Sequence, residues 1–288
     1  MTDHCYESCC RKALQKTSAN SQMDLSKKHN IHFAGNPHAG KTLVFGHGFG
    51  VDQQSFSQII PAFEQDYHII LYDNAGGGQA DLSSYSYERY ESLEGYVTDL
   101  TAIMGLTRGT PATFIGHSVS GMIGVMAANR QPHLFDKLVL IGSSPRYLND
   151  QPTSYIGGFD EVALKALFEA MQTNYEAWVI GFSPQAMRNA DRPELADQFA
   201  RSLQALRPDI ALAVAKAIFF LDHREELPKV TKPTLIIQTA NDIVVPPVVS
   251  EYMERHIPGS KRIKINAQGH FPQISAPGEI IAALQSFV

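Results

Sequence analysis

Cysteine is scarce in this sequence and absent beyond residue 10. Cys5, Cys9 and Cys10 are the three cysteines among 288 residues. The rest of the chain therefore cannot form a disulfide, which excludes the small secreted domains that disulfides hold together. His4 precedes the cysteines, but adjacent cysteines without a second ligand cluster fit zinc-ligand spacing poorly. We expect neither a metal ion nor a cofactor.

Clustered positive charge and long apolar runs are also missing. The 24 Lys and Arg residues are spread along the chain with 29 Asp and Glu residues, and the net charge is −5. Nucleic acid is therefore not an expected partner, because binding a phosphate backbone requires a basic cluster. No apolar run approaches the ~18 residues of a membrane span, and the amino terminus lacks the apolar segment of a signal peptide. We expect a cytoplasmic protein without membrane contact.

The first 27 residues differ from the rest in composition. Residues 1–27 are polar, rich in Ser, Lys and Gln, and without hydrophobic periodicity. Such a segment buries too little apolar surface to offset the entropy lost on ordering. We predict a disordered extension here, and Met23 is a candidate for the true start.

From residue 28, short apolar runs alternate with amphipathic stretches, which predicts a mostly parallel sheet flanked by helices on both faces. Strands are expected at residues 30–33, 42–45, 67–72, 112–115, 137–141, 234–239 and 262–265. The alternation stops at residues 150–230, where the apolar spacing is helical. We predict an α/β core of residues 28–149 and 231–288. The insertion at 150–230 is predicted to be a helical cap (lid) over the strand ends, where open α/β sheets bind ligands, and a peripheral decoration is the alternative.

Ser118 stands where an expected strand meets an expected helix, in the sequence Gly116-His-Ser-Val-Ser120. This resembles the G-x-S-x-G nucleophile elbow, whose sharp turn lifts a serine oxygen above the sheet. Ser120 replaces the last glycine, and we expect this change to be tolerated because serine is small enough for close packing. Without an elbow, Ser118 would be an ordinary helix cap.

Two later residues complete a triad in the chain order Ser, Asp, His, which is the order of α/β-hydrolases. Asp242 follows the expected strand at 234–239, and His270 follows the last expected strand. Asp222 is a competing acid, but it lies in a charged run typical of a solvated helix face. We predict Ser118 as nucleophile, His270 as its base and Asp242 as the acid that orients His270.

Attack on a carbonyl group also requires hydrogen-bond donors for the developing oxyanion. The sequence His-Gly-Phe-Gly at residues 47–50 follows an expected strand, and its glycines permit a sharp turn. We predict that the oxyanion hole consists of the backbone N–H groups of Phe49 and Val119. The glycine-rich residues 75–78 lack phosphate-loop spacing and a P-loop lysine, so we predict only a turn beside the site.

Together these motifs resemble the α/β-hydrolase group that holds the bacterial stress regulator RsbQ and the plant karrikin and strigolactone receptors. The likeness runs from about residue 28 to the end and includes the stretches Ser144-Pro-Arg-Tyr-Leu-Asn-Asp150 and Arg207-Pro-Asp-Ile-Ala211. It implies an α/β-hydrolase fold with an inserted four-helix cap over a mostly apolar substrate pocket. Motif matching places five aromatic residues in that pocket: Phe49, Tyr147, Trp178, Phe182 and Phe219. Periodicity alone would assign these aromatics to core packing.

The resemblance covers two kinds of function. The leading hypothesis is a serine hydrolase, independent of any cofactor, that cleaves a small, mainly apolar ester or lactone through an acyl-enzyme. The alternative is an RsbQ-like signalling sensor, which binds or slowly hydrolyses a small ligand and regulates a downstream protein. A purely structural binding module is a third and weaker hypothesis, because an idle site does not need a complete triad.

Overall fold

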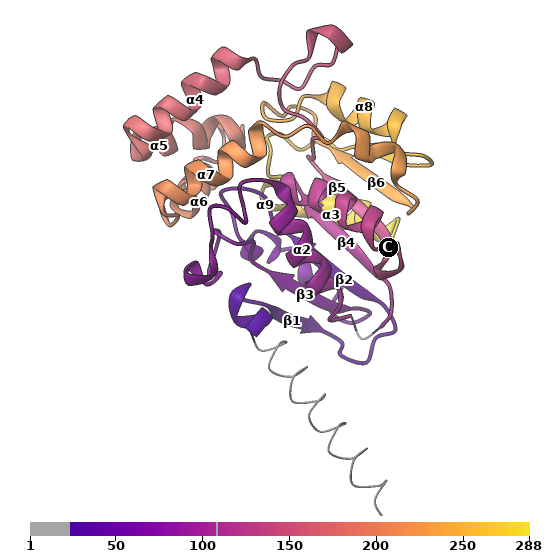
Figure 1. The fold of residues 1–288 in the computed structure, drawn as a ribbon. Coiled ribbons are helices and arrows are strands. Elements are labelled where there is room, and N and C mark those ends of the chain that lie inside the picture. Colours follow the sequence, from indigo (N-terminus) through magenta and orange to yellow (C-terminus); the bar gives the residue numbers. More distant parts are fainter. Residues whose placement is uncertain (1–23, 108) are drawn as a thin grey trace, which may run out of the picture.

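A seven-stranded sheet forms the centre of the computed structural model, which describes residues 24–107 and 109–288 (Figure 1). Its strands are β1 (His32–Gly35), β2 (Thr42–Gly46), β3 (His68–Tyr72), β4 (Ala112–His117), β5 (Phe135–Ile141), β6 (Thr234–Gln238) and β7 (Lys261–Lys264). Their spatial order is β1-β3-β2-β4-β5-β6-β7, with β1 antiparallel to β3 and the other neighbours parallel. The mostly parallel sheet is confirmed, and each predicted strand lies within two residues of an observed one.

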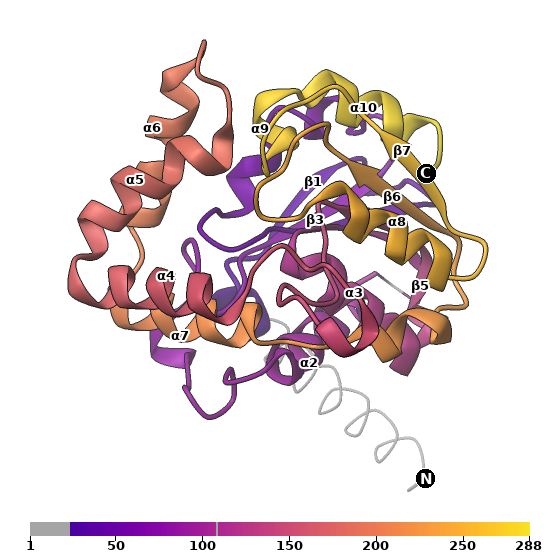
Figure 2. The ribbon, with the colours of Figure 1, turned by 90° about the horizontal axis from the view of Figure 1, so that it is seen from above.

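Helices cover both faces of this sheet (Figure 2). On one face lie α2 (Leu93–Met104), α3 (Val119–Arg130) and α8 (Pro247–His256). The opposite face is covered by α10 (Pro277–Gln285) and the 3-10 turns η1 (Gln53–Phe56) and η2 (Ile60–Ala62). Every residue of β2, β4 and β6 is buried, because parallel strands between two helical layers expose neither face. Shorter elements are η3 (Leu82–Ser84), η4 (Pro132–Leu134), η5 (Gln151–Thr153), η6 (Arg224–Lys229) and α9 (Pro272–Ser275).

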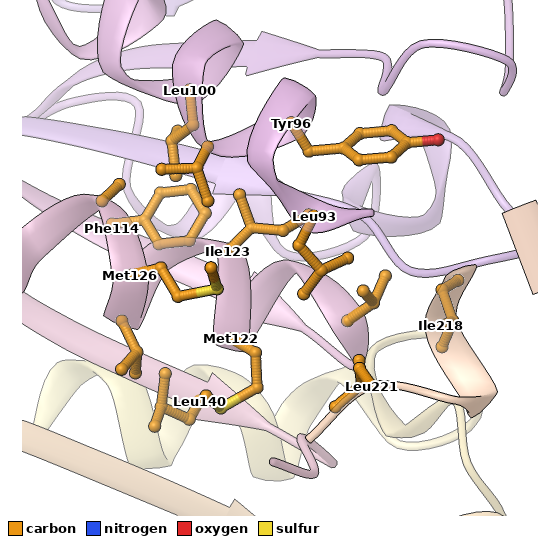
Figure 3. Close-up of a cluster of buried hydrophobic side chains, with 14 of the residues drawn as sticks. Leu93, Tyr96, Leu100, Phe114, Met122, Ile123, Met126, Leu140, Ile218 and Leu221 are labelled. Carbon is orange, nitrogen blue, oxygen red and sulfur yellow. The ribbon is translucent and has the colours of Figure 1, made fainter. Parts of the chain in front are cut away.

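The larger core cluster fixes α3 against the sheet (Figure 3). Met122 and Ile123 of α3 pack with Leu93 of α2, and all three are at most 1% exposed. Burying a side chain of this size contributes roughly 1.5–3 kcal/mol. Residues 119–128 of α3 are all buried, so this helix is held on every side. The segment that follows Ser118 therefore has a rigid support.

Four helices between β5 and β6 form the inserted cap. They are α4 (Glu161–Thr173), α5 (Tyr175–Met187), α6 (Pro193–Gln204) and α7 (Pro208–Phe219). Figures 1 and 2 both show them gathered beyond one end of the sheet, apart from the helices on its faces. The side chains of Asp160 and Asn174 cap α4 and α5, whereas α6 and α7 begin with proline.

The two chain segments that connect this cap to the core are joined to each other. Arg146 forms an isolated antiparallel bridge and an ion pair with Asp222. Arg224 pairs with Asp150 at 2.7 Å and with Asp222 at 2.8 Å. Burial alone would raise the pKa of Asp222, but hydrogen bonds from Arg224 and Arg146 lower this pKa to about 2. Asp222 is thus an exposed ion-pair partner at the cap boundary, and it lies on the bridge that precedes η6 (Arg224–Lys229).

The amino-terminal extension was expected to reach residue 27, but residues 24–28 form a helical turn. Leu25 in this turn packs against the larger core cluster, and Lys28 Nζ lies 2.8 Å from Asp99 Oδ1. The order of residues 24–27 is a correction to the predicted boundary, because their polar composition concealed one apolar anchor. The remainder of the predicted extension, with its cysteines and Met23, lies outside the described residues. No helix in the described part of the chain has the length and apolar character needed to cross a membrane.

Candidate active site

Ser118 sits on a strained turn between β4 and α3. Its φ of 55° and ψ of −125° place a non-glycine residue in a sparsely populated conformation. Gly116 lies so close to the start of α3 that a Cβ added there would be 2.6 Å from Gly121 N. The Ser118 N–H donates to Ile141 O on the neighbouring strand at 2.8 Å. Close packing and this hydrogen bond hold the turn in the shape of a nucleophile elbow.

The structure brings the side chains of Ser118, His270 and Asp242 together. His270 Nδ1 lies 2.7 Å from Asp242 Oδ2, and His270 Nε2 lies 2.9 Å from Ser118 Oγ. Asp242 Oδ1 accepts hydrogen bonds from the N–H groups of Val244 and Val245 at 2.8 and 3.1 Å. Because the carboxylate requires a donor at Nδ1, the neutral imidazole directs the lone pair of Nε2 at the Ser118 hydroxyl. Only 5–6% of each of these three residues is exposed.

The peptide groups of His270 are held from two directions. Its N–H donates at 2.8 Å to Ala186 O, one of the last carbonyls of cap helix α5. Its carbonyl accepts at 2.8 Å from His117 Nε2, beside the elbow. His117 is fully buried, and this burial lowers the pKa of its imidazole, so His117 acts as a neutral donor. Core and cap therefore both position the His270 loop.

The predicted oxyanion donors lie at the ends of β2 and β4. Val119 is the first residue of α3, where an N–H has no acceptor within its own helix. Within the described residues, neither the Val119 N–H nor the Phe49 N–H donates to another protein group. A Cβ added to Gly48 would lie 2.9 Å from Ser118 Cβ and 2.6 Å from His117 Nδ1. The loop at residues 47–50 therefore lies directly against the elbow and requires glycine there.

An apolar pocket opens beside these two N–H groups. It encloses about 430 Å³, including the space at its mouth. Phe49, Val119 and the turn at residues 74–77 line it near the elbow. The remaining walls come mostly from apolar residues of α2, α3 and the cap, namely Leu93, Tyr96, Ile123, Leu206, Val214 and Ile218, with Val51 after the loop at residues 47–50. Figure 3 shows Leu93 and Ile123 next to each other, with Ile218 farther along the same pocket wall. A lining of this kind favours a small apolar ligand.

The five aromatic residues assigned to the pocket occupy three places. Phe49 lines the pocket directly. Tyr147 is 1% exposed, its hydroxyl is 3.5 Å from Ser118 Oγ, and burial raises the pKa of this phenol. Phe219 packs on Tyr147 with ring centroids 5.0 Å apart. Trp178 and Phe182 stack at 5.2 Å. With Phe49 they border a buried cluster that joins α5 and α6 to the core and consists of Val51, Val179, Ala186, Met187, Phe199, Leu203, Phe271 and Ile274.

Sequence reasoning missed several residues that the fold adds to the site. Asn74, Tyr96 and Val214 line the pocket although no motif identified them. Asn74 follows the end of β3, which is paired with β2, so the rule that strand ends share one edge could have found it. Val214 lies on cap helix α7, and only the tertiary packing of that helix brings it here. The described residues contain no group of three His, Cys, Asp or Glu residues placed to hold a metal ion.

Comparisons with known proteins agree with this architecture. A family model described as the alpha/beta hydrolase fold matches residues 41–277. Strigolactone esterase D14 of Arabidopsis thaliana is 41% identical over 266 residues, covering 92% of this chain and 98% of that protein. Karrikin insensitive 2 receptor CA of Petunia hybrida is 40% identical over 261 residues, covering 90% and 95%. The solved structure of olei00960, a hydrolase from Oleispira antarctica, has a TM-score of 0.88 and 35% identity, covering 92% of this chain and 96% of that chain. The chain therefore belongs to the alpha/beta hydrolase fold family.

Proposed function

We propose that the protein is a serine hydrolase that cleaves a small, mainly apolar ester or lactone through an acyl-enzyme. The observation that carries this proposal is the continuous hydrogen-bonded chain from Ser118 Oγ through His270 to Asp242, with distances of 2.9 and 2.7 Å. A serine hydroxyl attacks slowly at neutral pH unless an adjacent base accepts its proton. This arrangement supplies that base in the required tautomer.

In the first half of the reaction, Ser118 Oγ attacks the carbonyl carbon while its proton passes to His270 Nε2. The carbonyl oxygen becomes an oxyanion that accepts hydrogen bonds from the N–H groups of Phe49 and Val119. Asp242 stabilises the positive charge that His270 then carries. When the tetrahedral intermediate collapses, His270 gives its proton to the departing alkoxide oxygen, and the acyl group remains on Ser118.

In the second half, His270 accepts a proton from water, and the resulting hydroxide attacks the acyl carbon. The oxyanion re-forms at the same two N–H groups. The proton returns from His270 to Ser118 Oγ as the carboxylic acid departs. For a lactone, the alcohol and the acid are parts of one product molecule.

Two observations support the proposed substrate class. The pocket beside Phe49 is lined mostly by apolar side chains and is small enough to select a compact molecule. A relative 41% identical to this chain is named a strigolactone esterase. We also propose that Tyr147, Trp178, Phe182 and Phe219 contact the substrate. Tyr147 reaches Ser118, and Trp178 and Phe182 pack around the same cluster as Phe49.

A sensor function is the second candidate, and the hydrogen bond from His270 N–H to Ala186 O favours it. Through this bond, a change at the catalytic base acts directly on cap helix α5. A relative 40% identical to this chain is named a receptor. In this second proposal, ligand binding or slow hydrolysis changes the cap and thereby its contact with a downstream protein.

The hydrolase proposal is tested with a fluorophosphonate probe and a short p-nitrophenyl ester. The probe should label Ser118 alone, and Ser118→Ala should abolish labelling and lower turnover by at least ~10⁴. Ser143→Ala is the matched control, because Ser143 is a buried serine near the elbow whose hydroxyl has no hydrogen-bond partner among the described residues. Turnover or labelling that survives Ser118→Ala would contradict the nucleophile assignment.

The sensor proposal has a separate test. Hydrogen exchange of α5 is compared in the Ser118→Ala protein with and without a saturating p-nitrophenyl ester, so that no hydrolysis complicates the signal. The proposal expects altered exchange in α5 and unchanged exchange in α10, which lies on a face of the sheet. Unchanged exchange in α5 would exclude a cap response to ligand.

A further inference from the structure

Ser120 replaces the last glycine of the usual elbow motif, and its side chain makes a hydrogen bond that glycine cannot make. Its Oγ donates to His47 O at 2.6 Å across the gap between α3 and the loop at residues 47–50. The residue is completely buried. A hydrogen bond of this kind contributes about 0.5–1.5 kcal/mol, so it helps to fix the His47 carbonyl.

Asn74 holds His47 at two further points. Its side-chain Nδ2 donates to His47 O at 2.9 Å and to Ser120 Oγ at 3.0 Å. Its backbone N–H donates to His47 Nε2 at 2.8 Å. Because Nε2 accepts a hydrogen bond, the proton of the neutral imidazole is on Nδ1. The Asn74 N–H thus fixes the tautomer of His47.

The protonated Nδ1 of His47 donates to Gly48 O at 2.8 Å. This carbonyl belongs to the same peptide unit as the N–H of Phe49. A peptide unit is planar and trans, so its C=O and N–H point in opposite directions. When the imidazole of His47 holds the carbonyl on one side, the Phe49 N–H must point to the other. That N–H has no protein acceptor among the described residues and lies beside the elbow.

We propose that His47, Asn74 and Ser120 form a clamp that aims the Phe49 N–H at the developing oxyanion. The inference rests on the proposed hydrolase function and adds positioning residues to it. None of the three needs to touch the substrate through its side chain. The serine in the fifth position of the elbow motif is then a functional part of the oxyanion hole, whereas small size alone would make it only a tolerated substitute for glycine.

The test compares Ser120→Ala with Ser143→Ala in the full chain, using a short p-nitrophenyl ester and a boronic acid. The boronic acid forms a tetrahedral adduct with the nucleophile and so reports on oxyanion binding. Removing one oxyanion donor outright lowers kcat by about 10²–10³, so a donor that is only misdirected should cost about 10-fold. In Ser120→Ala we expect kcat and boronate affinity to fall together by about this factor, with KM changed less than about 2-fold. Ser143→Ala should leave all three unchanged.

Two more variants keep the proposal testable if Ser120→Ala does not fold. His47→Gln keeps an acceptor for the Asn74 N–H but loses the donor to Gly48 O, and Asn74→Ala loses the side-chain donor to His47 O. Both should lower kcat and boronate affinity relative to Ser143→Ala. A kcat in all folded variants equal to that of Ser143→Ala, or a change in KM alone, overturns the clamp. If the clamp variants behave in this way and Ser118→Ala is inactive, only the clamp is overturned. If Ser118→Ala keeps its activity, the proposed hydrolase function is overturned as well.

Discussion

The core and the cap differ in how deeply their side chains are buried. In the core, Ser118, His270 and Asp242 come from loops at strand ends, and each is almost completely buried and hydrogen-bonded. In the cap, large apolar side chains face outward, with Val162 of α4 79% exposed and Ile180 of α5 61% exposed. A buried, fully bonded site cannot adjust without breaking bonds, whereas a helix with an open outer face can shift. The comparison supports our proposal that the core carries the chemistry and that the cap controls access and response.

The two regions meet where the His270 loop contacts the end of α5. Gly269 has a φ of +82°, and a Cβ added there would lie 2.1 Å from Met187 O. The loop at residues 47–50 also touches the cap, since a Cβ on Gly50 would lie 2.7 Å from Leu203 Cδ2. Three substitutions therefore probe the core, the boundary and the cap, with effects that should decrease in this order.

The largest effect is expected in the core, from Asp242→Asn. The N–H groups of Val244 and Val245 would hold the amide oxygen of the asparagine, so its NH2 group would face Nδ1 as a donor. His270 would then adopt the tautomer that places its proton toward Ser118. In a comparable triad this change lowers kcat by about 10⁴. The measurement is kcat for a short p-nitrophenyl ester, with the melting temperature as a check of folding.

Asp222→Asn is the matched control for this prediction, because Asp222 was the competing acid in the sequence. It loses ion pairs with Arg146 and Arg224 at the cap boundary, outside the triad. We expect its kcat to stay within a few-fold of the unaltered protein. If Asp222→Asn lowered kcat more than Asp242→Asn, the assignment of the triad acid to Asp242 in the core would be wrong.

The second prediction concerns the boundary, where Gly269→Ala should destabilise the protein. A non-glycine residue at this φ costs about 1–2 kcal/mol, and displacement of the Met187 carbonyl adds to this cost. We expect the free energy of unfolding in urea to fall by roughly 2–4 kcal/mol, a range typical of strongly perturbing substitutions. Turnover by the folded fraction should fall as well, because His270 is the next residue.

Gly181→Ala on the same α5 is the control for the boundary. Gly181 is exposed within a helix, and an added Cβ meets nothing within 4 Å. Alanine there should stabilise the protein by about 0.5–1 kcal/mol through the lower entropy of the unfolded chain. Equal effects of the two substitutions would show that α5 is not closely packed on the His270 loop.

The smallest effect is expected in the cap, from Trp178→Ala. Trp178 stacks on Phe182 beside the cluster that Phe49 borders, so its loss removes aromatic surface on the proposed substrate path. At a ligand contact this costs about 1–3 kcal/mol of binding. We expect KM for a naphthyl ester to rise while labelling by a small fluorophosphonate continues.

Ile180→Ala separates this contact from general damage to α5. Ile180 lies two residues away on the same helix and is largely exposed. Its removal should leave KM for the naphthyl ester unchanged. A KM that responds to neither substitution would place the cap helix α5 outside the substrate path.

Sequence reasoning located residues that lie together at strand ends, and their catalytic roles stay predictions. Ser118, Asp242 and His270 each follow a strand whose pattern is legible, and the observed sheet brings their side chains into one hydrogen-bonded chain. Sequence reasoning identified few of the pocket residues that distant segments contribute, because no local pattern encodes how α7 and α2 come to line one pocket. The hydroxyl of Ser120 is the clearest example, since the hydrogen bond that it makes is to the carbonyl of His47, 73 positions away. The expected cytoplasmic location and the downstream partner stay predictions.

The hydrogen bond between His270 N–H and Ala186 O has a thermodynamic consequence. The end of α5 leaves carbonyl groups without intrahelical donors, and the catalytic loop supplies one of those donors. A molecule that displaces the end of α5 therefore acts on the backbone of His270 as well. By linkage, if the charge on the His270 ring changes the strength of this bond, the position of α5 changes the proton affinity of the ring by the same free energy. In the proposed reaction, each protonation of His270 would then change the free energy of one position of α5 relative to another.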